Sequence, residues 1–227
     1  MISSILKKIK SYDLLVRMGR IKCRYKNCPK CSEKVENFKR HDSKKRIFFV
    51  IEDELVKKIE TLLLRWKCPL CKKTFMDYPS FALPYKNYIK QDVLRLAERY
   101  ITRPETSYES CASHENGIIL HKEKRDNKLD KNKPLHATFE KSTIHRWISS
   151  LAQLKNALQA ILQLIREKSP TSQIFREFEP IFRKKYRSEK RRIVLETVQK
   201  ILRTNFEFEK IFAISIFPQF ATPYWKD

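Results

Sequence analysis

Two pairs of cysteines with the same spacing are the residues in this sequence best suited to a defined chemistry. Both pairs have the form Cys-Pro-x-Cys, and their four members are Cys28, Cys31, Cys68 and Cys71. Two residues between paired cysteines let both thiolates of a short turn reach one ion, and two such turns complete a closed tetrahedral zinc site. The proline favours the turn because it fixes φ. The pattern therefore predicts Zn²⁺ as a structural cofactor.

Disulfides, a redox pair and buried free thiols are the alternatives for these cysteines. Six cysteines in 227 residues are too few for a disulfide scaffold, and the lysine-rich chain is typical of intracellular proteins, whose thiols stay reduced. A thioredoxin-like site needs only one Cys-x-x-Cys on a βαβ unit, which the pattern does not indicate. Of the remaining cysteines, Cys23 is a spare thiol near the first pair, and Cys111 is expected in a hydrophobic core.

The charge balance predicts a polyanionic partner. Lysine and arginine number 49 against 26 aspartates and glutamates, which gives a net charge of +23. Nucleic acid is the expected partner, and binding should weaken steeply with salt as counterions are released. The alternative is a low-GC genome that encodes lysine freely, but this does not explain the shortage of acidic residues.

Several classes of protein are disfavoured by what the sequence lacks. No stretch approaches the ~18 apolar residues of a membrane span, and the first residues lack the features of a signal peptide, so we expect a cytoplasmic protein with no membrane partner. The two glycines, Gly19 and Gly117, argue against glycine-built phosphate cradles. Neither a zinc-protease motif nor a Ser-His-Asp pattern is present, so we expect no enzymatic activity and no catalytic residues.

The predicted fold class is α+β, mainly α, with a small Cys₄ zinc ribbon followed by a helical helix-turn-helix domain. Residues 1–27 are predicted to form a basic N-terminal helix, either an arm along a nucleic-acid backbone or a helix packed on the ribbon. Its expected apolar stripe consists of Leu6, Ile9, Leu14, Leu15 and Met18.

Residues 28–76 are the predicted zinc ribbon. β-branched and aromatic residues indicate strands over 46–51 and 62–67, with Trp66 and Phe75 in the ribbon core, whereas residues 55–60 fit either a strand or a helix. A domain of this size has little core of its own, so its folding should be coupled to metal binding.

Residues 77–227 are the predicted helical domain, with basic C-terminal helices. Apolar periodicity and capping residues indicate four helical segments, and a charged loop is expected at 118–136. The four segments are 85–101, 107–115, 140–167 and about 187–204. Within this domain, residues 85–151 fit a helix-turn-helix motif, and a plain helical bundle is the alternative.

The helix that begins near residue 142 is the candidate recognition helix. Its N-terminal polar residues would face base edges and phosphates, because a recognition helix enters the major groove in this way. These residues are Ser142, Thr143, His145 and Arg146, whereas Ile144, Trp147 and Ile148 should point inward.

A second candidate nucleic-acid contact is the basic run at 183–192. Its basic members are Arg183, Lys184, Lys185, Arg187, Lys190, Arg191 and Arg192. Cations are unfavourable at the positive N-terminal end of a helix dipole, so a surface that tracks phosphates would explain the run. A solvated start of a helix is the alternative.

Four segments of this chain resemble the zinc-ribbon and helix-turn-helix proteins of bacterial mobile elements, which are related to N-terminal regions of insertion-sequence transposases. Many of these proteins are known only as carrying a domain of unknown function. The segments are CPKC at 28–31, LRWKCPLCKKTF at 64–75, FALPY at 81–85 and STIHRW at 142–147.

The resemblance implies that the four paired cysteines bind zinc and that the helix at 142–147 reads double-stranded DNA. It implies a regulator or a transposition accessory with a transposase or other mobile-element protein as partner. The chain departs from the pattern in its 118–136 insert, and 227 residues leave no room for a catalytic domain after the helices. The alternatives are an RNA-binding or ribonucleoprotein module, and a protein–protein adaptor that uses the aromatic residues 206–225.

Overall fold

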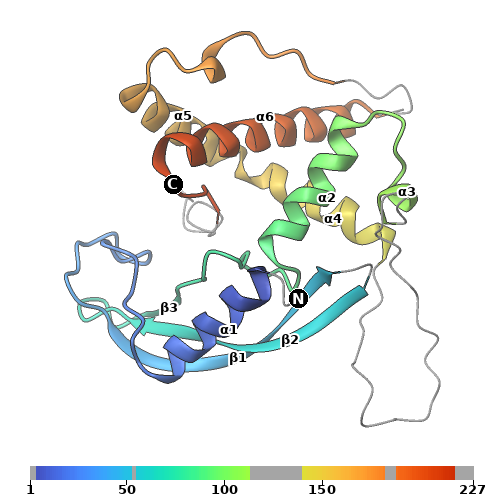
Figure 1. Ribbon diagram of the computed structural model, residues 1–227. Coiled ribbons are helices and arrows are strands. Elements are labelled where there is room, and N and C mark those ends of the chain that lie inside the picture. Colours follow the sequence, from blue (N-terminus) through green and yellow to red (C-terminus); the bar gives the residue numbers. More distant parts are fainter. Residues whose placement is uncertain (1–3, 53–54, 113–139, 182–187, 218–227) are drawn as a thin grey trace, which may run out of the picture.

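The computed structural model describes residues 4–52, 55–112, 140–181 and 188–217 (Figure 1). It has an α+β fold, as predicted, with helices and one small antiparallel sheet. Figure 1 shows the β1–β2 hairpin as a curved lower layer with α1 along it, and α2, α4, α5 and α6 gathered above. Within these described ranges, no helix combines the length and apolar content needed to cross a bilayer.

The sheet has the strand order β1-β2-β3. Strands β1 (Lys39–Glu52) and β2 (Leu55–Lys67) pair along their whole length, and the short β3 (Thr74–Met76) pairs with the end of β2. Residues 55–60, which the sequence left open, are strand, because Phe48 lies opposite Ile59 and both sit on one apolar face. Strand β1 also begins well before the predicted residue 46, since its polar first half pairs with the apolar residues of β2.

Helix α1 (Ser4–Arg17) packs against β2. Asp13 joins the two elements: its Oδ1 accepts hydrogen bonds from the Leu62 N–H (3.0 Å) and from the Thr61 hydroxyl (2.9 Å). The helix therefore satisfies a donor of β2, where an unpaired strand edge would otherwise be open to other chains.

The predicted apolar stripe of this helix was partly wrong. Ile9 and Val16 are the buried residues, whereas the predicted Leu14, Leu15 and Met18 are exposed. The true stripe has four- and three-residue steps, which keep its members on one helical face. It consists of Ile5, Ile9, Tyr12 and Val16, and the predicted Leu6 is half-buried against the same cluster.

The helical part begins with α2 and ends with the long α6. The predicted helix over 140–167 is interrupted, because a 3₁₀ turn separates α4 from α5, and the last helix runs further than residue 204. The bounds are α2 Lys90–Thr102, α3 Tyr108–Ala112, α4 Lys141–Leu151, the 3₁₀ turns Ala152–Leu154 and Gln173–Phe175, α5 Lys155–Lys168 and α6 Glu189–Phe212. The predicted loop at 118–136 lies outside the described residues.

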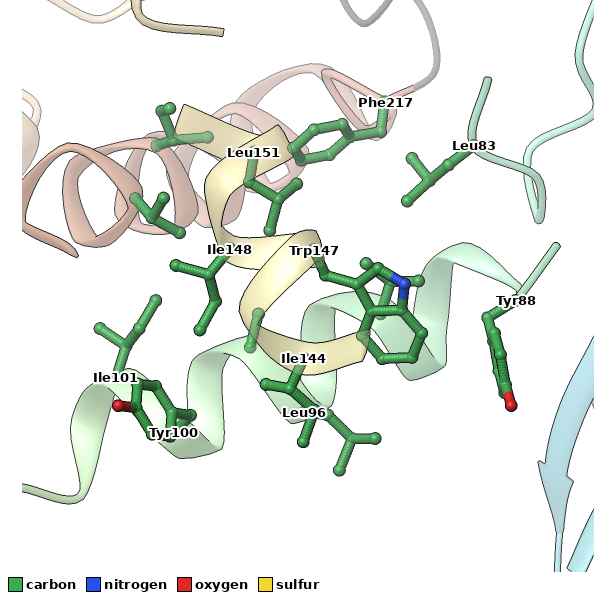
Figure 2. Close-up of a cluster of buried hydrophobic side chains, with 14 of the residues drawn as sticks. Leu83, Tyr88, Leu96, Tyr100, Ile101, Ile144, Trp147, Ile148, Leu151 and Phe217 are labelled. Atoms are coloured by element: carbon green, nitrogen blue, oxygen red, sulfur yellow. The ribbon is translucent and has the colours of Figure 1, made fainter. Parts of the chain in front are cut away.

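Helix α4 crosses α2 through a set of buried apolar side chains (Figure 2). Ile144, Trp147 and Ile148 are buried on α4, as predicted. Ile144 lies beside Leu96 of α2, and the Trp147 ring meets the Tyr88 ring at 5.0 Å. Because this stripe points inward, the opposite face of α4 carries its polar residues toward solvent.

The sheet and the helices are joined at one end of β1. Phe49 accepts a hydrogen bond from the Ile89 N–H (3.1 Å) and donates its own N–H to the Asn87 carbonyl (2.8 Å). Ile51 and Val56 belong to the same buried cluster as the residues of α2 and α4. The end of the β1–β2 hairpin therefore holds the start of α2 in place, and α4 is positioned by its packing against α2.

Candidate metal centre and nucleic-acid interface

The four paired cysteines lie in two turns built in the same way. In each turn, the first cysteine donates its N–H to the carbonyl five residues later, and its carbonyl accepts the N–H four residues later. These hydrogen bonds are Cys28 N to Glu33 O (2.9 Å), Ser32 N to Cys28 O (2.8 Å), Cys68 N to Lys73 O (3.0 Å) and Lys72 N to Cys68 O (3.1 Å). The shared pattern explains why both pairs need the same spacing.

Each turn reverses through one residue with a left-handed backbone. Ser32 has a φ of 61° and Lys72 a φ of 62°, a region that glycine occupies freely and other residues rarely adopt. The tight reversal leaves backbone N–H groups directed at sulfur, and the Lys30 N–H lies 3.4 Å from the Cys28 Sγ. Such N–H groups stabilise a thiolate over a thiol.

The sulfur positions fit a tetrahedral metal ion. All four Sγ atoms lie within 4.8 Å of one another. The Cys28–Cys71 and Cys31–Cys68 separations are 3.8 and 4.0 Å, whereas four sulfurs about 2.3 Å from a central ion would lie about 3.8 Å apart. These distances are far too long for a disulfide. The donor set and its spacing therefore fit a closed four-thiolate metal site.

The first cysteine of each turn is buried and the second is half-buried. Cys28 and Cys68 pack in one apolar cluster with Phe38, Trp66 and Phe75, the last two as predicted for the ribbon core. Burial raises the pKa of Cys28 to about 12. Burial also acts to raise the pKa of Cys68, but N–H groups of Cys71 and Leu70 and the neighbouring thiols outweigh it and lower that pKa to about 7. The cluster is thus able to hold a thiolate near neutral pH.

Cys23 and Cys111 lie outside this group of sulfur atoms. Cys23 is half-buried beside the same apolar cluster, and burial raises its pKa to about 12. Cys111 is buried in the helical core, as expected.

An ion pair that no local sequence pattern indicates stabilises the two cysteine turns at 28–33 and 68–73, here called the metal turns. Arg24 precedes the first turn, and its Nε donates to Asp77 Oδ1 (2.9 Å) while its backbone N–H donates to Oδ2 (3.1 Å). The guanidinium also reaches the Tyr78 carbonyl. Asp77 is buried just after β3, so this pair ties the segment before the first turn to the segment after the second. Partners 53 residues apart leave no local pattern in the sequence.

The candidate recognition residues line the outer face of α4. Ser142, His145 and Arg146 are exposed and Thr143 is half-buried. The Arg146 guanidinium lies 3.4 Å from the Thr143 hydroxyl. Among the described residues no carboxylate forms an ion pair with Arg146, so its charge is available to a ligand.

The start of α6 lies against the same face of α4. Arg191 donates to the Ser149 hydroxyl of α4 (3.0 Å) and to the Tyr108 hydroxyl of α3. The Tyr108 ring meets the His145 ring edge-on at 5.8 Å. Burial and the Arg191 cation lower the pKa of His145. The structure therefore brings Arg191 and His145, two predicted contacts from distant parts of the sequence, onto one surface.

The other members of the basic run differ in their surroundings. Lys190 is exposed and has no ion-pair partner in the described ranges. Arg192 pairs with Glu189 (3.4 Å) and Glu196 (3.7 Å) of its own helix, so part of its charge is compensated. The predicted contacts Arg183, Lys184, Lys185 and Arg187 lie outside the described residues.

Residues 28–118 match a family described as a domain of unknown function (DUF6431). No curated protein matches the chain, and no solved structure does. The matched segment contains both metal turns, the sheet, α2 and α3, and it stops before α4. A match to a domain of unknown function was expected from the sequence, and it leaves the function to be inferred from the two surfaces described above.

Proposed function

We propose that this chain is a DNA-binding protein that contains a structural Zn²⁺ ion and is not an enzyme. Helices α2, α3 and α4 would act as a helix-turn-helix unit, with α4 in the major groove of double-stranded DNA. One observation carries this proposal: the exposed face of α4 holds Arg146, whose guanidinium pairs with no carboxylate in the described part of the chain, whereas Lys141 of the same helix pairs with Glu109 (3.4 Å).

The donor atoms support Zn²⁺ as the metal. Four cysteine sulfurs at tetrahedral spacing favour Zn²⁺ over the hard cations Mg²⁺ and Ca²⁺, which take oxygen ligands. Four protein ligands leave no open position for water or substrate, so the ion would stabilise the fold and would not catalyse a reaction.

The arrangement around α4 supports contact with a duplex. Arg146 can donate two hydrogen bonds to a guanine edge, and the hydroxyls of Ser142 and Thr143 can reach phosphates or bases. Arg191 fixes the start of α6 beside α4, and the exposed Lys190 next to it would contact a neighbouring phosphate. These roles divide the surface into base-reading and backbone-positioning groups.

Salt-dependent duplex binding tests this proposal. The dissociation constant of a mixed-sequence duplex would be measured by fluorescence anisotropy between 50 and 300 mM salt, for the wild type, Arg146→Gln and Lys190→Gln. Lys190→Gln loses a phosphate contact and should lower the slope of log K against log salt by about 1, whereas Arg146→Gln loses a base contact and should weaken binding by about 1–3 kcal/mol with little change in slope. Lys210→Gln is the matched control, because Lys210 lies on the same helix about 30 Å from Lys190 and its loss should leave the slope unchanged.

Two results would contradict the DNA assignment. One is the absence of duplex binding at 50 mM salt, and the other is equal weakening by all three substitutions. A structured RNA of the same length that outcompetes the duplex would favour the RNA-binding alternative.

The biological setting is part of the same proposal. The motifs at 28–31, 64–75, 81–85 and 142–147 resemble those of mobile-element proteins, so we infer a regulator or a transposition accessory whose partner is a transposase or another mobile-element protein. A transposase or reverse-transcriptase gene beside the gene for this chain would support this role, and a neighbourhood of housekeeping genes in every genome that carries it would contradict it.

A further inference from the structure

Tyr85 is held in solvent in a conformation that tyrosine rarely adopts. Its side chain is 71 % exposed, and its φ of 61° lies in the left-handed region that favours glycine or asparagine. Neither burial nor backbone preference explains an aromatic residue here. Strained residues of this kind persist where surrounding contacts fix them, and they gather at ligand sites.

Contacts on both sides of Tyr85 fix its backbone. Leu83 is buried in the helical core, and the Lys86 N–H donates to the Leu83 carbonyl (3.2 Å), which closes a turn around Tyr85. The Lys86 carbonyl accepts a hydrogen bond from the Arg46 guanidinium (3.2 Å). The tyrosine ring is therefore presented from a rigid base and does not hang from a free loop.

Three basic residues near this turn have no acidic partner in the described ranges. Arg46 of β1 donates to the Lys86 backbone carbonyl. The Tyr88 ring meets the Trp147 ring of α4 at 5.0 Å, which brings this segment against α4, and burial together with the Arg146 charge lowers the Lys86 pKa. The Nε of Arg46 is buried and has no hydrogen-bond partner. In the part of the chain that the structure describes, none of the three forms an ion pair, so no carboxylate there compensates their charge and a bound anion would be attracted.

We propose that Tyr85 and these three cations bind one unpaired nucleotide at a junction between duplex and single-stranded DNA. The base would stack on the Tyr85 ring, and its phosphate would lie among Arg46, Lys86 and Arg146. Paired bases are covered by their neighbours in the stack, so an exposed ring can stack only on an unpaired or terminal base. This inference rests on the proposed function, because Arg146 belongs to both surfaces and places the nucleotide directly beside the duplex on α4.

The test compares a blunt duplex with the same duplex carrying a three-nucleotide tail, attached at either the 5′ or the 3′ end. A base–aromatic stack should make the wild type bind one tailed duplex about 5- to 150-fold more tightly than the blunt one. A 2-aminopurine as the first tail base should lose fluorescence on binding, as it does when it stacks.

Substitutions at residue 85 separate stacking from folding. Tyr85→Gly removes the ring and also relieves the left-handed strain, so the protein should melt no lower than the wild type while the preference for the tail disappears. Tyr85→Phe keeps the stacking ring and should keep the preference. Blunt-duplex affinity should be the same for all three proteins.

The outcomes for this inference and for the proposed function can be told apart. If the wild type binds blunt and tailed duplexes equally well, the junction site is refuted while duplex binding stands. If the preference survives in Tyr85→Gly, the stacking role is refuted. If no duplex is bound at all, both the proposed function and the junction site fall.

Discussion

Replacing Asp92 with asparagine should stabilise the protein at neutral pH. Asp92 lies on α2 with only 4 % of its surface exposed. Its Oδ2 accepts the Ile51 N–H (2.8 Å), the hydrogen bond that fastens α2 to the end of β1, and its Oδ1 accepts a bond from Arg95 (3.2 Å). Burial raises the pKa of Asp92 from 3.8 to about 6, because the ionised carboxylate loses more hydration than its partners return.

The size of the effect follows from that shift. A rise from 3.8 to about 6 corresponds to about 3 kcal/mol at 1.36 kcal/mol per pH unit. The folded protein binds this proton more tightly than the unfolded chain does, so the contribution of Asp92 to stability falls as pH rises from about 4 to 6. The ionised Asp92 carboxylate therefore destabilises the fold by the full amount above pH 6 and by nothing below about pH 4.

Asp92→Asn keeps an oxygen for the Ile51 N–H and has no charge to bury. We expect a gain in unfolding free energy at pH 7 of up to about 3 kcal/mol, shrinking toward zero as the pH approaches 4. Urea denaturation of wild type and variant at pH 5, 6 and 7 measures the difference in their unfolding free energies. Any loss of metal at low pH affects both proteins equally and cancels in this difference.

Asp42→Asn is the control of opposite sign. Asp42 does not bury its charge, because its side chain is partly exposed. It accepts hydrogen bonds from Arg65 (2.6 and 2.8 Å), which lower the pKa of Asp42. Its removal should destabilise the protein at pH 7 by an amount that stays nearly constant down to pH 5 and fades only below about pH 4, because the lowered pKa lies below 3.8. A difference between Asp92→Asn and wild type that stays constant from pH 5 to 7 would refute the reasoning about Asp92.

Two further predictions concern the metal turns. Lys72→Gly should raise the thermal midpoint, with a gain of about 1 kcal/mol from relief of the left-handed backbone, and a lower midpoint in a thermal melt would argue against the role given to this residue. We expect elemental analysis to find one equivalent of Zn²⁺ in the wild type and none in Cys68→Ser. The packing around Trp66 should loosen in this variant, because folding and metal binding are coupled in such sites. Cys111→Ser, a buried cysteine outside the cluster, should retain the metal, and full zinc occupancy in Cys68→Ser would contradict the four-sulfur site.

The two best-predicted features are those whose signals lie within a short stretch of sequence. Each metal turn is closed by hydrogen bonds spanning at most five residues, so the Cys-Pro-x-Cys spacing already contains its geometry. In α4, the large apolar residues Ile144, Trp147, Ile148 and Leu151 all fall on one face, so the pattern fixes which side is buried and which is free for a ligand.

Helix α1 shows why other features could not be predicted in this way. Apolar residues occur around more than one face of this helix, and the sequence alone favoured Leu14 and Leu15. The buried face is selected by Asp13, whose carboxylate bonds to β2 and turns Ile9 and Val16 toward the sheet. That choice depends on a partner about 50 residues away. The strand at 55–60 has its partners much closer in the sequence, but it too is decided by pairing, with residues 47–52 of β1.

The metal site and the proposed DNA surface lie at opposite ends of one hairpin, and strand register connects them. The metal turns adjoin the Lys39–Lys67 end of the β1–β2 pair, whereas Phe49 and Ile51 hold residues 87–89 and α2 at the other end. A slip of one residue would turn every side chain of β1 to the opposite face and would remove Arg46 from Lys86. Since the distance from Lys39 to Phe49 is about 33 Å along an extended strand, a metal ion held by the four cysteines would not touch α4. Any effect of metal removal on the proposed DNA surface would therefore pass through the register of this strand pair.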